Sequence, residues 1–170
     1  MVKKITENTK YMIMGYVFVV GSVVAYYSKV FINIGLNEWY QLIYHPFLAP
    51  ANFFFPVAWM LADILLGAAF ILLVLRLPSI EFPKYNYPFL GLLIMQFLWC
   101  YTFFYYRWLG VGLLIMIPYM VITFKTIRTF REGDAQSALL LYPYFIFIIY
   151  TTLVNMSFVN EHGLTAIIYM

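Results

Sequence analysis

The chain has 170 residues, of which 65% are hydrophobic and 10% are charged, and it carries a formal net charge of +3. A typical soluble domain is about 25% charged, so this composition excludes an ordinary soluble domain. The small positive excess requires no nucleic-acid partner, because the topology of a membrane protein accounts for where the basic residues fall.

Long stretches without charge predict helices that cross a membrane. Four stretches contain no charged side chain: residues 11–28, 85–106, 108–124 and 135–160. A fifth, residues 46–75, contains only Asp63. A membrane-spanning helix needs about 20 apolar residues, and membrane strands are excluded because these runs are long and do not alternate.

We therefore expect an all-α integral membrane protein that forms a single domain over residues 1–170. Five transmembrane helices are predicted at about residues 11–31, 57–76, 87–107, 109–129 and 138–160. Most Lys and Arg residues fall in the N-terminal tail and in the loops after the second and fourth helices, and only Lys29 and Arg107 fall on the other side. Because cytoplasmic loops are rich in Lys and Arg, we predict that the N-terminus lies inside and the C-terminus outside, in the cell membrane if the source is a prokaryote.

The connection between the first two helices contains three prolines and many aromatic residues. Pro46, Pro50 and Pro56 exclude a helix interior there, because proline lacks an N–H and clashes with the preceding turn. A loop of this length is usually functional or disordered, and its aromatic content is too apolar for disorder. We expect a long ordered loop that caps a ligand pocket. A belt of aromatic side chains at the membrane interface is the alternative, and both can hold.

No motif for a nucleotide, a metal or a catalytic nucleophile is visible. Gly110 and Gly112 lack the strand and the third glycine of a dinucleotide fingerprint. His45 and His162 are isolated in loops, and Cys100 is the single cysteine, so metal ligands do not cluster. We predict no catalytic residues, no metal site and no cofactor.

Four motifs follow one another along the chain. The first is Trp39-Tyr40 with the three prolines, and the second is Trp59-x-Leu61 with Gly67. The others are Trp99, Phe103, Phe104, Arg107 and Gly110, and then Leu139-Leu140-Leu141-Tyr142-Pro143-Tyr144 with Thr151, Thr152 and Asn155. In this order, over about residues 39–163, they resemble the translocator protein family (TspO/MBR), also called tryptophan-rich sensory protein or peripheral-type benzodiazepine receptor.

The resemblance implies a five-helix bundle with a pocket under the first loop. The pocket would bind porphyrins such as protoporphyrin IX, sterols and benzodiazepine-type compounds within the membrane lipid. By the same resemblance it would be lined by Trp39, Pro46, Trp59, Phe147, Thr151, Val154 and Asn155. A homodimer is also implied, formed through the third helix, where one stripe contains Gly91, Leu92, Met95 and Trp99.

Helical spacing supports part of this site independently. Phe147, Thr151, Val154 and Asn155 lie on one face of one helix. Lipid offers Thr and Asn no hydrogen-bond partner, so this face should turn inward. It then either lines a pocket or packs against other helices, for which Thr and Asn are equally useful.

The chain departs from the family at several positions. Phe147 stands where the family has Trp, Gln96 where it has Asn, and Asp63 where it has Tyr. Met156 and Asn160 replace the Tyr and the basic residue of the family's sterol pattern, so sterol binding through that pattern is not expected. Porphyrin photochemistry, which the resemblance links to two pocket tryptophans, would be reduced because one of the two is missing.

Asp63 is the only charge-capable residue deep in a predicted helix, one turn after Trp59 on the same face. A lone carboxylate in a membrane is costly, so we expect a neutral acid that is hydrogen-bonded to Gln96, Tyr150 or Thr151. It either holds helices together, which is the simpler role, or serves a ligand or a proton. Asp63 and Gln96 complete the candidate ligand-binding residues.

The leading functional prediction is a membrane receptor or transport protein for large lipophilic ligands. Aromatic side chains give a flat tetrapyrrole both contact area and offset stacking, which favours this function. The alternatives are a light-dependent porphyrin-degrading enzyme with Trp59 as its redox-active aromatic, a proton-coupled carrier that uses Asp63, and a structural bundle without a ligand.

Overall fold

A computed structural model of the chain describes residues 6–77 and 82–163. Five helices in this part are long and apolar enough to cross a membrane, and no strand occurs in it. Their bounds are α1 Glu7–Gly35, α2 Phe54–Arg76, α3 Phe82–Cys100, α4 Leu109–Gly133 and α6 Leu141–His162. Three short segments complete them: the π-helical η1 Leu36–Tyr40 and η2 Tyr101–Tyr105, and α5 Ala135–Leu139. The predicted all-α membrane fold with five helices is therefore confirmed.

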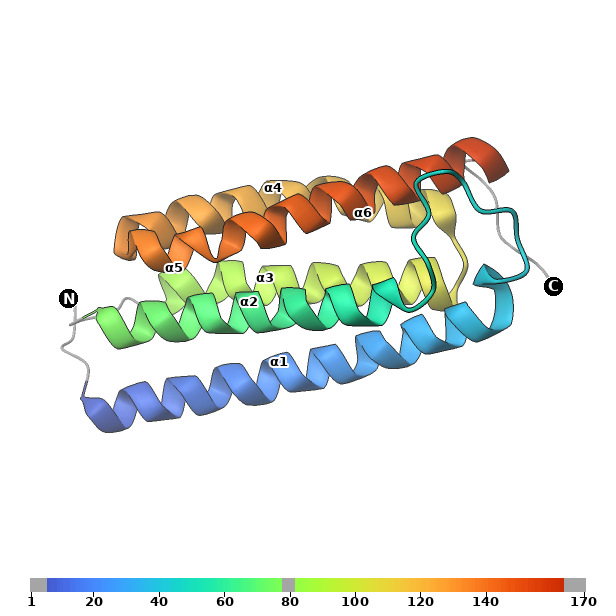
Figure 1. The fold of residues 1–170 in the computed structure, drawn as a ribbon. Helices are drawn as coiled ribbons and strands as arrows, with labels where there is room; N and C mark the ends of the chain where they lie inside the picture. Colours follow the sequence, from blue (N-terminus) through green and yellow to red (C-terminus); the bar gives the residue numbers. More distant parts are fainter. Residues whose placement is uncertain (1–5, 78–81, 164–170) are drawn as a thin grey trace.

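The helices form a bundle with α1 at one side and α4 and α6 at the other (Figure 1). α2 and α3 run between them. α1 packs against α2 and α3, α4 packs against α3 and α6, and α2 also contacts α6. Because α1 lies at the edge of the bundle, it is the least buried of the five spanning helices.

Several helices extend beyond the charge-free stretches that predicted them, α4 as far as Gly133. α1 continues through η1 to Tyr40, so Trp39 and Tyr40 belong to a helix, and the loop before α2 covers only residues 41–53. α3 begins at Phe82, earlier than the expected residue 87, with Pro83 in its first turn. A proline in the first turn removes no helical hydrogen bond, since that N–H has no partner within the helix.

The loop of residues 41–53 is tied down by side chains from the helices around it. The Tyr40 hydroxyl donates to the carbonyl of Pro50 at 3.2 Å, and the Tyr150 hydroxyl of α6 donates to that of Leu48 at 3.2 Å. Near the end of α6, His162 Nε2 lies 3.2 Å from the carbonyl oxygen of Tyr44. The loop is thus ordered, as predicted, and it runs across the bundle end beside α6 (Figure 1).

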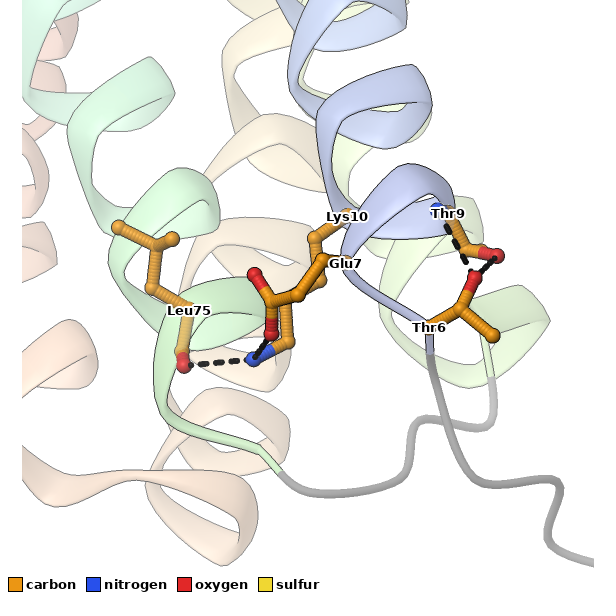
Figure 2. Close-up of polar contacts among 5 residues, drawn as sticks. All are labelled: Thr6, Glu7, Thr9, Lys10 and Leu75. Atoms are coloured by element: carbon orange, nitrogen blue, oxygen red, sulfur yellow. Dashed lines mark hydrogen bonds and ion pairs between the residues drawn. The ribbon is translucent and has the colours of Figure 1, made fainter.

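At the opposite end of the bundle, contacts of the first turn of α1 join this helix to α2 (Figure 2). The Thr6 hydroxyl accepts a hydrogen bond from the Thr9 N–H at 3.2 Å, which caps α1. Lys10 Nζ lies 3.4 Å from Glu7 and donates to the carbonyl of Leu75 at 3.3 Å. One lysine therefore satisfies a free carbonyl in the last turn of α2 and joins α1 to α2 at this end.

The stripe on α3 that was predicted to form a homodimer faces the protomer's own core. Leu92 and Trp99 have no exposed surface. A Cβ on Gly91 would lie 3.3 Å from Ile122 of α4. The homodimer stays a prediction, and Leu92 and Trp99 are not free to form its interface, whereas Gly91 and Met95 are partly exposed.

Candidate functional site

A cavity of about 730 Å³ lies between α1 and α2, with α3 behind it. Trp59 and Asp63 of α2 line it, and Phe89 and Leu93 of α3 form its back wall. Its volume falls within the roughly 300–1,000 Å³ typical of small-molecule sites. Of the nine predicted ligand-binding residues, Trp59 and Asp63 are the two that line it.

Small side chains on both helices create this space. Gly21 and Ala25 of α1 face Gly67 and Ala68 of α2 across it. A Cβ added to Gly21 or to Gly67 would meet no atom within 4 Å. The helices are therefore not pressed together at these glycines, in contrast to the close contacts that small residues usually permit in membranes.

The rim of the cavity is apolar and exposed. Phe18 and Tyr26 of α1, and Met60 and Ile64 of α2, line the cavity and keep large exposed surfaces. All four lie within helices that span the membrane. The cavity therefore opens toward the lipid between α1 and α2, and not toward the loop of residues 41–53, none of whose residues lines it.

Trp59 separates the cavity from the other half of the bundle. Its ring lies 5.4 Å from that of Trp99 and meets that of Phe147 edge-on at 5.0 Å. The side chain is almost fully buried, yet Nε1 has no hydrogen-bond partner among the described residues. Trp59 is thus held by aromatic contacts, and its N–H is buried without a hydrogen-bond partner among the described residues.

The predicted face of α6 is packed in this structure. The Thr151 hydroxyl donates to the carbonyl of Phe147 at 2.9 Å, and Val154 is fully buried. Asn155 Oδ1 accepts from Trp99 Nε1 at 3.0 Å, while its Nδ2 donates to the carbonyl of Leu109 at 2.9 Å. Such saturated contacts match the helix-packing alternative for this face. Phe147 reaches a second, smaller groove of about 240 Å³ between α2 and α6.

Trp39 and Pro46 also lie apart from the cavity. Trp39 Nε1 donates to the carbonyl of Phe104 at 2.8 Å, and the ring is completely buried. Pro46 is buried within the loop. Trp39 therefore fixes η1 against η2, and Pro46 belongs to the loop that runs beside α6.

Asp63 and Gln96 lie beside one another, but their hydrogen bonding is incomplete. The carboxyl of Asp63 is next to the Gln96 side chain, which has no exposed surface. Even so, neither polar atom of Gln96 makes a hydrogen bond of good geometry among the described residues, and neither does Asp63 Oδ1. The other two expected partners are engaged elsewhere, Tyr150 with Leu48 and Thr151 with Phe147. Because hydrogen-bond geometry determines whether a polar atom is satisfied, these atoms are near one another but unsatisfied.

Ser28 of α1 is a candidate that the sequence analysis missed. It lines the cavity, is almost fully buried, and its hydroxyl oxygen has no hydrogen-bond partner among the described residues. The rule applied to Thr151 and Asn155 would have found it, since lipid offers a polar side chain no partner and such a residue should turn inward. Lys29, the next residue, also lines the cavity, and its side chain is exposed.

The comparison with protein families agrees with this architecture. A model of the TspO/MBR family matches residues 13–160, which include all five spanning helices at least in large part. No curated protein matches the chain.

Proposed function

Because the matched region is nearly the whole chain, this protein belongs to the TspO/MBR family, and we propose that it binds porphyrins such as protoporphyrin IX, sterols or benzodiazepine-type compounds. Family membership supports a role as a membrane receptor or transporter in general. The ligands are our proposal, and so is their location in the cavity between α1 and α2.

The observation that carries the proposal is an apolar cavity with an aromatic wall that opens toward lipid. A lipophilic ligand dissolved in the bilayer would reach Trp59 between the exposed rims of α1 and α2 without passing through water. The Trp59 ring offers a flat ligand the offset or edge contacts that aromatic groups prefer.

Titration with protoporphyrin and with a sterol, followed by tryptophan fluorescence quenching, tests this proposal. Trp59→Ala should weaken protoporphyrin affinity by about 1–3 kcal/mol, as expected for loss of one central aromatic anchor. The matched control is Trp108→Ala, because Trp108 is partly exposed and stacks on Tyr106 away from the cavity. Equal losses at the two tryptophans would contradict a site centred on Trp59.

A second variant tests the location of the ligand without touching the aromatic core. Gly67→Leu places a large side chain into open space within the cavity, so it should block ligands while the protein still folds. Gly15→Leu is the control, since Gly15 is also unobstructed but does not line the cavity. Unchanged affinity in Gly67→Leu would place the ligand elsewhere, with the Phe147 to Asn155 face of α6 as the next candidate.

Proton-coupled transport is a second candidate function, favoured by the position of Asp63. This carboxyl lines a cavity that opens toward lipid, and one of its oxygens lacks a partner among the described residues. A carrier that uses Asp63 would show ligand uptake driven by a pH gradient, and Asp63→Asn would abolish that dependence. Uptake that does not depend on the pH gradient would contradict the carrier function and favour a receptor.

We also propose that the N-terminus lies inside the membrane-bound compartment and the C-terminus outside. Lys10, Arg76, Lys84 and Arg131 lie near one end of the bundle, and Arg107 pairs with Glu38 near the other. Cysteine accessibility tests this orientation: Glu38→Cys should be labelled from outside and Glu132→Cys from inside. Labelling of Glu38→Cys from the cytoplasmic side would overturn it.

A further inference from the structure

The wall of the cavity between α1 and α2 carries polar groups that the porphyrin and sterol proposal does not use. We propose that these groups recognise an amine, so that the preferred ligand is a lipophilic amine whose charged nitrogen lies against Asp63 and Ser28, with Gln96 beside the Asp63 carboxyl. The inference rests on the proposed function, because it assumes that lipophilic molecules occupy this cavity.

The first argument is the set of polar atoms without partners. Asp63 Oδ1, both polar atoms of Gln96 and the Ser28 hydroxyl make no hydrogen bond among the described residues. Ser28 is 1% exposed and Gln96 is 0% exposed, so water does not compensate either side chain. A buried polar group without a partner destabilises the folded protein, and native proteins contain few of them.

The second argument is that these atoms come from three helices and meet at one place. Ser28 is on α1, Asp63 on α2 and Gln96 on α3. Ser28 and Asp63 line the cavity, and Gln96 lies beside the Asp63 carboxyl. The Cys100 thiol is close to Ser28, but a thiol is a weak hydrogen-bond partner. A single ligand group at this point would contact Ser28 of α1 and Asp63 of α2, and would be linked to Gln96 of α3 through the Asp63 carboxyl.

The chemistry of the cluster selects an amine. Asp63, Gln96 and Ser28 all present oxygen atoms that accept hydrogen bonds, and an ammonium group donates up to three. A carboxylate within a membrane normally pairs with a cation, yet no ion pair among the described residues includes Asp63. Trp59 lines the same cavity, and an indole ring attracts a nearby cation.

Lys29 is the one basic residue that lines the cavity, so its effect on a cationic ligand has to be considered. Its side chain is exposed and lies toward the end of α1 that leads into η1. A long lysine side chain on a spanning helix keeps its stem on apolar surface and directs its ammonium group toward water. It would repel a cation at the cavity mouth and would not neutralise Asp63.

A matched pair of fluorescent probes tests the inference. Anthracenylmethylamine and anthracenylmethanol share one flat apolar body and differ in the amine and the hydroxyl. Both are titrated into the full-length protein in nanodiscs of neutral phosphatidylcholine at neutral pH, with empty nanodiscs to correct for partition into lipid. Energy transfer from tryptophan to anthracene reports binding.

We expect the wild-type protein to bind the amine about tenfold more tightly than the alcohol, as one charge-assisted hydrogen bond provides. Asp63→Asn keeps the size of the side chain and removes its charge, and should lower amine affinity until this preference is lost. Glu38→Gln is the control, because it removes one carboxylate at an exposed position outside the cavity. Lys29→Gln should maintain or raise amine affinity.

Each contrary result is informative. Equal affinity for the two probes in the wild-type protein, or an amine preference that survives Asp63→Asn, overturns the amine site. If both probes are then blocked by Gly67→Leu, the proposed lipophilic-ligand function still stands. If protoporphyrin and sterol fail to bind while the amine preference is present and depends on Asp63, the amine site stands and those two ligands are wrong.

Discussion

The two sides of the bundle use their polar residues in opposite ways. Where α3, α4 and α6 meet, Asn155 satisfies Trp99 and the carbonyl of Leu109, and the hydroxyls of Tyr119 and Tyr144 lie 2.6 Å apart. Where α1 meets α2, the polar atoms of Ser28 and Asp63 that lie inside the bundle lack partners among the described residues, and the glycines face open space. The polar groups named on the first side are hydrogen-bonded without a ligand, whereas those on the second side are not.

The comparison indicates that one side of the bundle provides its stability and the other side leaves space for a ligand. Lipid is as apolar as Leu, so helices associate through close packing and hydrogen bonds and not through the hydrophobic effect. The packed side provides both kinds of contact, which allows α1 at the edge to leave a cavity beside α2. Local regions of low stability are where ligand-binding elements are usually found.

Breaking the packed side should have the largest effect. Asn155→Leu leaves the Trp99 N–H and the Leu109 carbonyl without their present partners, so the free energy of unfolding should fall by about 2–4 kcal/mol. SDS titration in mixed micelles measures this change. Asn160→Leu is the control, because Asn160 is exposed on the same helix and should change stability little. Similar losses in both variants would mean that the Asn155 network is not what holds this side together.

Replacing one glycine on each side by alanine compares the two sides directly. The expected change in the free energy of unfolding is smaller than for Asn155→Leu. In Gly112→Ala the new Cβ would lie 2.9 Å from Asn155 Oδ1, and this oxygen cannot move without losing its bond to Trp99. We expect a loss of about 1–3 kcal/mol, as for other overpacked cores.

Gly67→Ala is the partner variant, because its Cβ meets no atom within 4 Å. It should leave the free energy of unfolding unchanged or raise it by up to about 1 kcal/mol, since Ala favours a helix more than Gly does. Destabilisation of both variants by the same amount would remove the difference between the two sides.

The fold could be predicted from the sequence because each stretch without charge is about as long as a helix that crosses a bilayer. The helix ends could not, since they depend on tertiary contacts. Trp39 belongs to the helix because its indole N–H donates to the carbonyl of Phe104 on η2. This partner is far away in the sequence. Pro56 marked the loop in the sequence, yet α2 accommodates it in its first turn.

The candidate site was predictable in part for a related reason. Spacing along one helix placed Trp59 and Asp63 on a shared face, and both line the cavity. The cavity itself depends on how far α1 stands from α2, and no pattern within either helix encodes that distance. Helical periodicity likewise predicted that Asn155 points into the bundle, but it could not predict whether Asn155 contacts a ligand or Trp99.

The smallest expected effect on stability concerns Asp63, and its sign distinguishes the two roles considered for this residue. If Asp63 held the helices together, Asp63→Leu would destabilise the protein. Its oxygen without a partner indicates the opposite: removing an unsatisfied polar group from the bundle should raise the free energy of unfolding by about 1 kcal/mol. Asp63→Asn, which keeps a polar side chain of the same size, should change it less. A ligand amine should then cancel this difference in stability. At ten times the wild-type dissociation constant it stabilises the wild-type protein by about 1.4 kcal/mol, but a variant that binds tenfold more weakly by only about 0.4 kcal/mol. SDS titrations of wild-type and Asp63→Leu protein with and without anthracenylmethylamine measure both effects. Destabilisation by Asp63→Leu in the absence of ligand would show that the carboxyl belongs to the packed framework after all.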